Sequence, residues 1–129
     1  MRSRLLYLFA LAVLPNLLGG AAHAAETPVA GAWIDQNLDC SSVFVTTAKG
    51  QKFKQPADLF APAFIISGKR LTTPQASCSL KSVSTLADRT QLQLSCANSV
   101  SVSPVTVQLS RGSDGTLERY MDTNDKSGS

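Results

Sequence analysis

Three cysteines and nine acidic side chains are the residues of this 129-residue chain whose types could support covalent, acid–base or metal chemistry. A cysteine nucleophile works beside a histidine, and carboxylates serve as acids, bases or metal ligands. The one histidine, His23, lies in an N-terminal segment that we expect to be removed. The remaining chain therefore lacks the commonest general base, which argues against catalysis and against a zinc site.

Most acidic residues fall in predicted turns or in the C-terminal tail, where carboxylates typically cap turns and face solvent. Asp35 and Asp39 flank one loop, but two carboxylates do not complete a cation site. We therefore predict no catalytic residue, no cofactor and no metal ligand. The acidic residues outside the N-terminal segment are Glu26, Asp35, Asp39, Asp58, Asp88, Asp114, Glu118, Asp122 and Asp125.

The three cysteines predict one disulfide and one leftover thiol. Apolar and polar residues alternate on both sides of Ala87, and folding the segment 76–97 about this residue sets Cys78 opposite Cys96. Opposed Cβ atoms on paired strands lie about 4.5 to 5.5 Å apart, close to what a disulfide needs. We predict the Cys78–Cys96 bridge with Cys40 unpaired; a bridge from Cys40 to either partner, which would close a longer loop, is the alternative.

The first 24 residues have the three parts of a secretory signal peptide: two arginines, an apolar stretch over 5–18, and small residues ending at Ala24. A proline and an asparagine interrupt the apolar stretch, which argues against a membrane span. We expect cleavage before Ala25, no lipid anchor because no cysteine lies near that point, and a protein located in the periplasm or secreted.

Removal of this segment also removes two arginines, which leaves ten basic residues against nine acidic ones and a net charge of +1. This balance argues against nucleic-acid binding. Two clusters of basic residues, at 49–54 and 69–70, are expected to keep exposed strands soluble, and Phe53 should face the core.

The remaining residues, about 105 in number, suit one domain, 25–121, followed by a polar tail, 122–129, that we expect to be disordered.

Short β-branched and aromatic runs separated by turn residues predict an all-β fold. Their order favours a small antiparallel meander, closed or nearly closed into a barrel of about seven to nine strands, with a β-sandwich as the alternative. The segment 56–62 should form a helical turn and plug one barrel mouth with Phe60 and Phe64. The expected strands are 31–35, 42–48, 51–55, 63–67, 70–73, 76–84, 89–97, 101–110 and 116–121.

The segment Val29-Ala30-Gly31-Ala32-Trp33 resembles the G-x-W opening of lipocalin-like barrels, in which the tryptophan closes the barrel floor. With Cys40 nearby, it is also similar to small periplasmic barrels that inhibit bacterial metalloproteases, and more generally to small exported proteins of alphaproteobacteria. The resemblance implies a structural role for Trp33. We also predict that Trp33 is buried, because a lone tryptophan in so small a chain has a large apolar area to hide. The inhibitor family inserts its N-terminus into the protease cleft, and residues 25–28 here do not match that segment.

Together these features favour a non-enzymatic periplasmic binding or interaction protein, in its most concrete form an inhibitor of an exported hydrolase. The alternative is a lipocalin-like carrier of a small apolar ligand. The expected partner is accordingly another exported protein or a small apolar molecule. An empty barrel would favour the carrier, and a filled barrel with an ordered, protruding N-terminus would favour the inhibitor.

Overall fold

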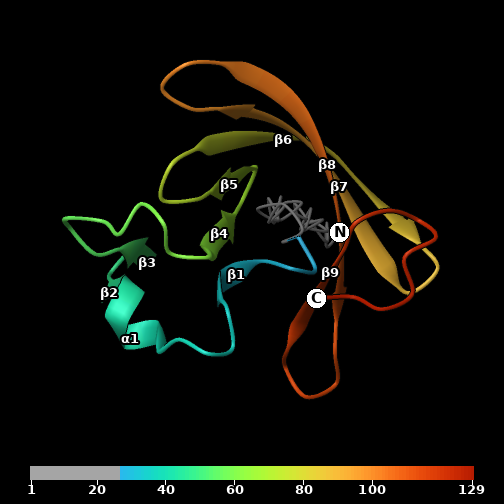
Figure 1. The fold of residues 1–129 in the computed structure, drawn as a ribbon, viewed down its shortest axis with the longest axis horizontal. Helices are drawn as coiled ribbons and strands as arrows, with labels where there is room; N and C mark the ends of the chain where they lie inside the picture. The colour runs from blue at the N-terminus through green and yellow to red at the C-terminus, as the bar shows by residue number, and fades with distance from the viewer. Residues whose placement is uncertain (1–26) are drawn as a thin grey trace, which may run out of the picture.

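The computed structural model describes residues 27–129, which form nine strands and one four-residue helix (Figure 1). The expected signal segment and the expected mature start at Ala25 lie outside these residues. The all-β class is confirmed. In chain order the elements are β1 (Gly31–Ile34), α1 (Cys40–Val43), β2 (Phe44–Thr47), β3 (Gly50–Phe53), β4 (Ala63–Ser67), β5 (Arg70–Thr72), β6 (Ser77–Leu86), β7 (Arg89–Ala97), β8 (Val102–Arg111) and β9 (Leu117–Tyr120).

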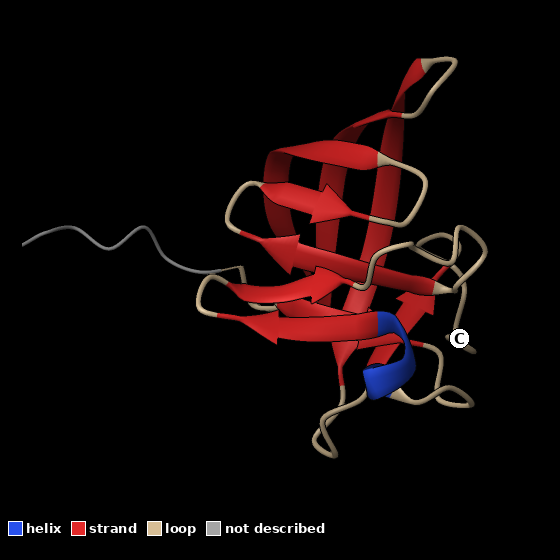
Figure 2. Cartoon of the chain, turned by 90° about the vertical axis from the view of Figure 1, so that its left-hand side faces the viewer, coloured by secondary structure: helices blue, strands red, loops and turns tan. Residues whose placement is uncertain are grey.

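Seven strands form one antiparallel sheet that curves into a nearly closed barrel (Figure 2). Their order is β1-β4-β5-β6-β7-β8-β9, so from β4 onward each strand pairs with its neighbour along the chain. An unsealed seam separates the two edge strands, β1 and β9. Strands β2 and β3 form a separate hairpin between β1 and β4. The predicted barrel is thus confirmed, with two of the strands outside it.

The β6–β7 hairpin has the predicted register at its open end and a different one at its turn. Leu80 lies opposite Leu94 and Cys78 opposite Cys96, as expected. A β-bulge between Leu80 and Ser82 then adds one residue to β6, so that Val83 lies opposite Leu92. A bulge of this kind increases local twist, which helps a sheet to curve into a barrel.

The barrel interior is filled by apolar side chains from most of its strands. Leu92 of β7 and Leu109 of β8 are 0% and 1% exposed. Because alternate residues of each strand point inward, these side chains meet at the barrel axis. The buried cluster comprises Val29, Ile66, Leu71, Cys78, Leu92, Leu94 and Leu109.

A second, smaller core lies on the outer face of β1 and β4, beneath the β2–β3 hairpin. The hairpin covers this face with Phe44 and Phe53, whose ring centroids are 5.4 Å apart. Phe53 therefore faces a core, as predicted. The two faces of β4 are both apolar, and this accounts for the unbroken run Ala63-Phe64-Ile65-Ile66.

The segment 56–62 differs from its expected role as a helical plug. It forms a turn in which the Asp58 carboxylate accepts a hydrogen bond from the Phe60 backbone N–H at 3.0 Å. Phe60 is 87% exposed, whereas Ala61 belongs to the second core. The plug hypothesis is therefore wrong for Phe60; Phe64 does pack against the barrel core.

The C-terminal segment 122–129, expected to be disordered, folds back onto the barrel. Arg119 and Ser129 exchange two backbone hydrogen bonds, of 2.7 and 2.8 Å. The Arg89 guanidinium donates to the backbone carbonyls of Asp122 and Asp125 and lies 3.5 Å from the centre of the Tyr120 ring. Local composition does not reveal this order, because its anchor, Arg89, lies 33 and 36 residues away from the two carbonyls.

Candidate functional site

The acidic side chains of the described region act mainly as turn caps. Asp39 caps α1, and hydrogen bonds from the Ser41 hydroxyl and then from its backbone N–H lower the pKa of the carboxyl. Thr116 lowers the pKa of Asp114 in the same way. Asp35 accepts hydrogen bonds from the backbone N–H and the side-chain amide of Asn37. Within residues 27–129, no three acidic, cysteine or histidine side chains gather as they would around a metal ion.

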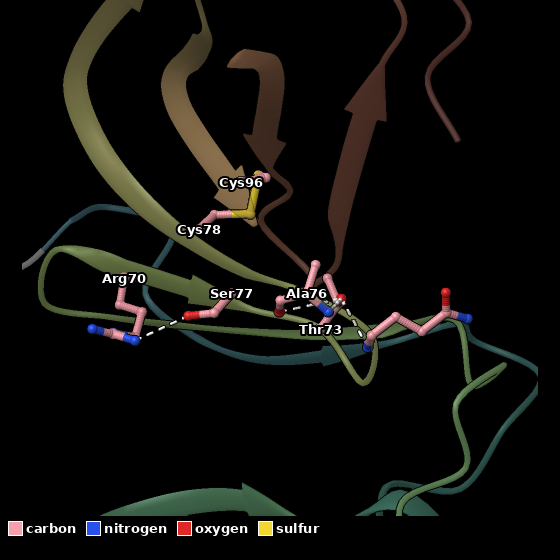
Figure 3. Close-up of a disulfide and its surroundings, with 7 residues drawn as sticks. Arg70, Thr73, Ala76, Ser77, Cys78 and Cys96 are labelled. Carbon is pink, nitrogen blue, oxygen red and sulfur yellow. Dashed lines mark hydrogen bonds between the residues drawn. A yellow bond between two sulfur atoms is a disulfide. The ribbon is translucent and has the colours of Figure 1, made fainter. Parts of the chain in front are cut away.

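The disulfide joins Cys78 of β6 to Cys96 of β7, which confirms the predicted pairing (Figure 3). Both cysteines face the barrel interior, and their Cα atoms are 3.9 Å apart. Nearby, the Arg70 guanidinium of β5 donates a 3.0 Å hydrogen bond to the Ser77 hydroxyl of β6. The bridge therefore ties the central hairpin together at the end where β7 leads into the turn before β8. Cys40 is a free, exposed thiol at the start of α1.

The G-x-W motif lies at the seam. Gly31 has a φ of +138°, which favours glycine, while a Cβ there would make an ordinary van der Waals contact of 3.5 Å with Trp33 Nε1. Trp33 Nε1 donates to the Val29 carbonyl at 3.0 Å. Arg111 of β8 donates to the Ala30 carbonyl at 3.1 Å and stacks 4.9 Å above the indole.

Trp33 has the structural position that was expected but is only half-buried. The prediction of full burial is wrong because the seam is open at this point and the exposed Arg111 side chain, instead of the core, covers one face of the indole. Arg111 was not singled out from the sequence, since 77 or more residues separate it from the motif it contacts. Together the two side chains close the gap between β8 and the chain entering β1.

A groove of about 470 Å³ lies outside the barrel, between the β2–β3 hairpin, α1 and β1. A smaller hollow of about 150 Å³ continues from it toward the β4–β5 turn, and the two share Ala32 and Gln51. The lining mixes apolar, hydroxyl and amide groups with the Cys40 thiol. The groove is lined by Ala32, Cys40, Ser41, Phe44, Thr46 and Gln51.

The turn between β7 and β8 projects beyond the start of β6 (Figure 1, upper left; Figure 2, top). Val100 and Val102 are 88% and 71% exposed there. The Asn98 side-chain oxygen accepts hydrogen bonds from the backbone N–H groups of Val100 and Ser101, both at 2.9 Å. The expected strands 89–97 and 101–110 place a turn here, as observed. Its exposed valines, which lie in a serine-rich run after Cys96, were not singled out.

The two basic clusters are exposed, as the solubility interpretation expects. Lys49, Lys52 and Lys54 lie on or beside β3 of the outer hairpin, while Lys69 and Arg70 lie at the β4–β5 turn. Lys49 lines the smaller hollow, together with Ser67 of β4.

No protein-family model matches this chain, and neither the curated proteins nor the solved structures contain a significant match. The resemblance to lipocalin-like barrels therefore stays a prediction from the G-x-W motif. Of the part of the chain that the structure describes, no helix is long and apolar enough to cross a membrane.

Proposed function

We propose that this chain is a non-enzymatic binding or interaction protein of the periplasm or the secreted fraction, and most concretely an inhibitor of an exported hydrolase. The main support for this proposal is that apolar side chains fill the barrel interior, while the groove beside the β2–β3 hairpin and the exposed β7–β8 turn lie outside it. The Cys78–Cys96 bridge supports an oxidising compartment.

The alternative is a carrier that holds a small apolar ligand inside the barrel. This function needs an internal cavity, and Leu92, Leu94 and Leu109 occupy that space with exposures of 3% or less. The interaction function needs no cavity. It requires only a rigid scaffold that presents a surface, which a disulfide-bridged barrel supplies.

Native mass spectrometry of protein isolated from its own exported fraction separates the two functions. We expect the oxidised chain either alone or bound to a second protein. A retained small molecule that is released on unfolding would instead support the carrier. Inhibition assays against exported proteases, with the reduced and heat-unfolded protein as a control for non-specific effects, then test the inhibitory form of the proposal.

A further inference from the structure

Strand β6 has a free outer edge over its second half. On that side its neighbour is β5, which pairs with Ser77–Ser79, and Leu80 then donates its backbone N–H to the Lys69 carbonyl. Residues 82–86 pair with β7 alone, and all of them are exposed. The tip of the β6–β7 hairpin lies away from β5 (Figure 1, yellow, right). Such an edge presents backbone N–H and C=O groups to which a further strand can bond.

The hairpin geometry shows which residues point outward at this edge. In an antiparallel pair, residues that bond to the partner strand alternate with residues that point away from it. The two-residue turn 87–88 makes the flanking pair, Leu86 and Arg89, a bonded one. Counting back along β6, Ser84 bonds to β7 as well. Val83 and Thr85 therefore direct their N–H and C=O groups outward.

Two other edges of the same sheet are protected against a further strand. Residues 102–107 of β8 lack a neighbour on the β9 side, but Pro104 within them has no N–H to offer. The outer edge of β9 is occupied, because Arg119 exchanges backbone hydrogen bonds with Ser129. Neither device is present in the free half of β6.

The side chains of the β6 edge suit a second copy of the same strand. Residues 82–86 include no proline and no charged residue, and Val83 and Leu86 are 42% and 39% exposed. Lys81 precedes this segment and Asp88 follows it. Antiparallel pairing of two identical strands brings the basic end of each beside the acidic end of the other, and opposite charges stabilise such pairing.

We propose that two copies of this chain pair antiparallel through residues 82–86 of β6, about a twofold axis at Ser84. Val83 of each copy then lies opposite the partner's Thr85, and each of these pairs exchanges both of its N–H···O bonds. The contact is isologous, so it closes with two copies. It is much smaller than the usual about 20 to 30 residues a side, and we therefore expect a weak dimer.

Sedimentation velocity of the oxidised protein over a range of concentrations tests this pairing. We expect a monomer–dimer equilibrium in the wild type. Ser84→Lys places two ammonium groups opposite each other at the axis and should raise the dissociation constant by at least about fivefold. Gln93→Lys is the matched control, because it adds the same charge at an exposed position of β7, opposite Ser82 and away from the axis. It should change the constant by less than about twofold.

Two further measurements test the register. The amides of Val83 and Thr85, but not that of Ser84, should gain protection from hydrogen exchange as the concentration rises. Lys81→Glu should raise the dissociation constant by about fivefold, and the double variant Lys81→Glu/Asp88→Lys should restore it to within about twofold, because the swap again places opposite charges side by side.

Unchanged thermal unfolding will show that each variant folds, since all of these positions are exposed. A wild type that stays monomeric at every concentration would overturn the inference. So would a dimer that tolerates Ser84→Lys, equal losses in Ser84→Lys and Gln93→Lys, or a charge-swapped double variant that binds no more tightly than Lys81→Glu.

Discussion

Arg111 links the end of the barrel to its beginning through its side chain. Its guanidinium binds the Ala30 carbonyl and stacks on Trp33, although neither β1 nor β9 pairs across the seam. A planar guanidinium can donate hydrogen bonds in its plane while an aromatic ring covers its face, which a lysine cannot do equally well. The seam is therefore held by side-chain contacts in place of a hydrogen-bonded ladder.

Replacing Arg111 should weaken this closure measurably. Arg111→Ala removes one hydrogen bond and one cation–π contact, so we expect the free energy of unfolding to fall by about 1 to 2 kcal/mol. The chain has a single tryptophan, so its fluorescence should report the change directly as a shift to longer wavelength. Urea unfolding of Arg119→Ala, whose side chain has only a 3.8 Å contact to Met121 sulfur, is the control; equal losses in both variants would contradict a specific role for Arg111.

Ala87 and Gly68 allow a matched test of backbone strain in two turns. Ala87 has a φ of +55° in the β6–β7 turn, and Gly68 has a φ of +56° in the β4–β5 turn. Positive φ disfavours residues with a Cβ by about 1 kcal/mol. We expect Ala87→Gly to raise, and Gly68→Ala to lower, the unfolding free energy by about this amount in chemical denaturation. Changes of the same sign in the two variants would refute the strain argument.

The elements outside the barrel are less strongly held than those within it. The β2–β3 hairpin pairs only with itself, and it contacts the barrel through the small core around Phe44. Strand β7, in contrast, pairs with a strand on each side over most of its length. Regions with few paired neighbours open at lower free energy than the whole protein does.

Amide hydrogen exchange should therefore divide the chain into two groups. The amides of β7 should exchange only through global unfolding, whereas those of β2 and β3 should exchange faster, through local opening of the hairpin. Exchange followed by mass spectrometry at increasing urea concentrations measures both. Equal protection of the hairpin and β7 would show that the two cores unfold as one unit.

The C-terminal segment carries a carboxylate that should make its order depend on pH. Asp125 accepts a hydrogen bond from the Met121 backbone N–H, and further ones from the Ser127 side chain and backbone, and these lower its pKa from 3.8 to about 2. A carboxyl with a lowered pKa in the folded state stabilises that state above its unfolded pKa and loses the contribution as the pH falls through the folded value.

We accordingly expect the segment to stay ordered above about pH 4 and to loosen as the pH falls toward about 2. The amide NMR shifts of Met121 and Ser127 provide a local readout, which is needed because Asp39 and Asp114 also have lowered pKa values. Asp125→Asn should show the loosened state at neutral pH and no transition. A wild-type midpoint near 4 would show that the carboxylate does not hold the segment.

The sequence predicted elements where local pattern determines them. The bounds of β4 and β7 match the expected ranges to the residue, because the apolar run of β4 and the apolar alternation of β7 each end at turn residues. The helix α1 was missed because four residues cannot show a helical period, although Asp39 followed by Ser41 was a capping signal. The bulge after Leu80, the Arg111–Trp33 contact and the folded C-terminal segment all depend on tertiary contacts, which local pattern does not encode.

At the scale of the whole molecule, the Cys78–Cys96 bridge connects the barrel core to the projecting β7–β8 turn. Cys78 is 3% exposed and belongs to the core cluster, while Cys96 lies two residues before Asn98, which organises the turn. The same covalent link therefore stabilises the fold and limits motion of the exposed β7–β8 turn.

The last prediction concerns the oxidation state of all three cysteines. One thiol, Cys40, should react with a thiol reagent in the native protein, and three should react after reduction and unfolding, because Cys40 is exposed and the other two are bridged.

The double variant Cys78→Ala/Cys96→Ala should lose about 3 kcal/mol of unfolding free energy, the value expected for a loop of this length. Cys40→Ser should change it by less than about 0.5 kcal/mol, as for other exposed positions. Tryptic mapping of unreduced protein checks the pairing, since Lys81 and Arg89 lie between the bridged residues; Cys40 in a linked peptide would contradict it.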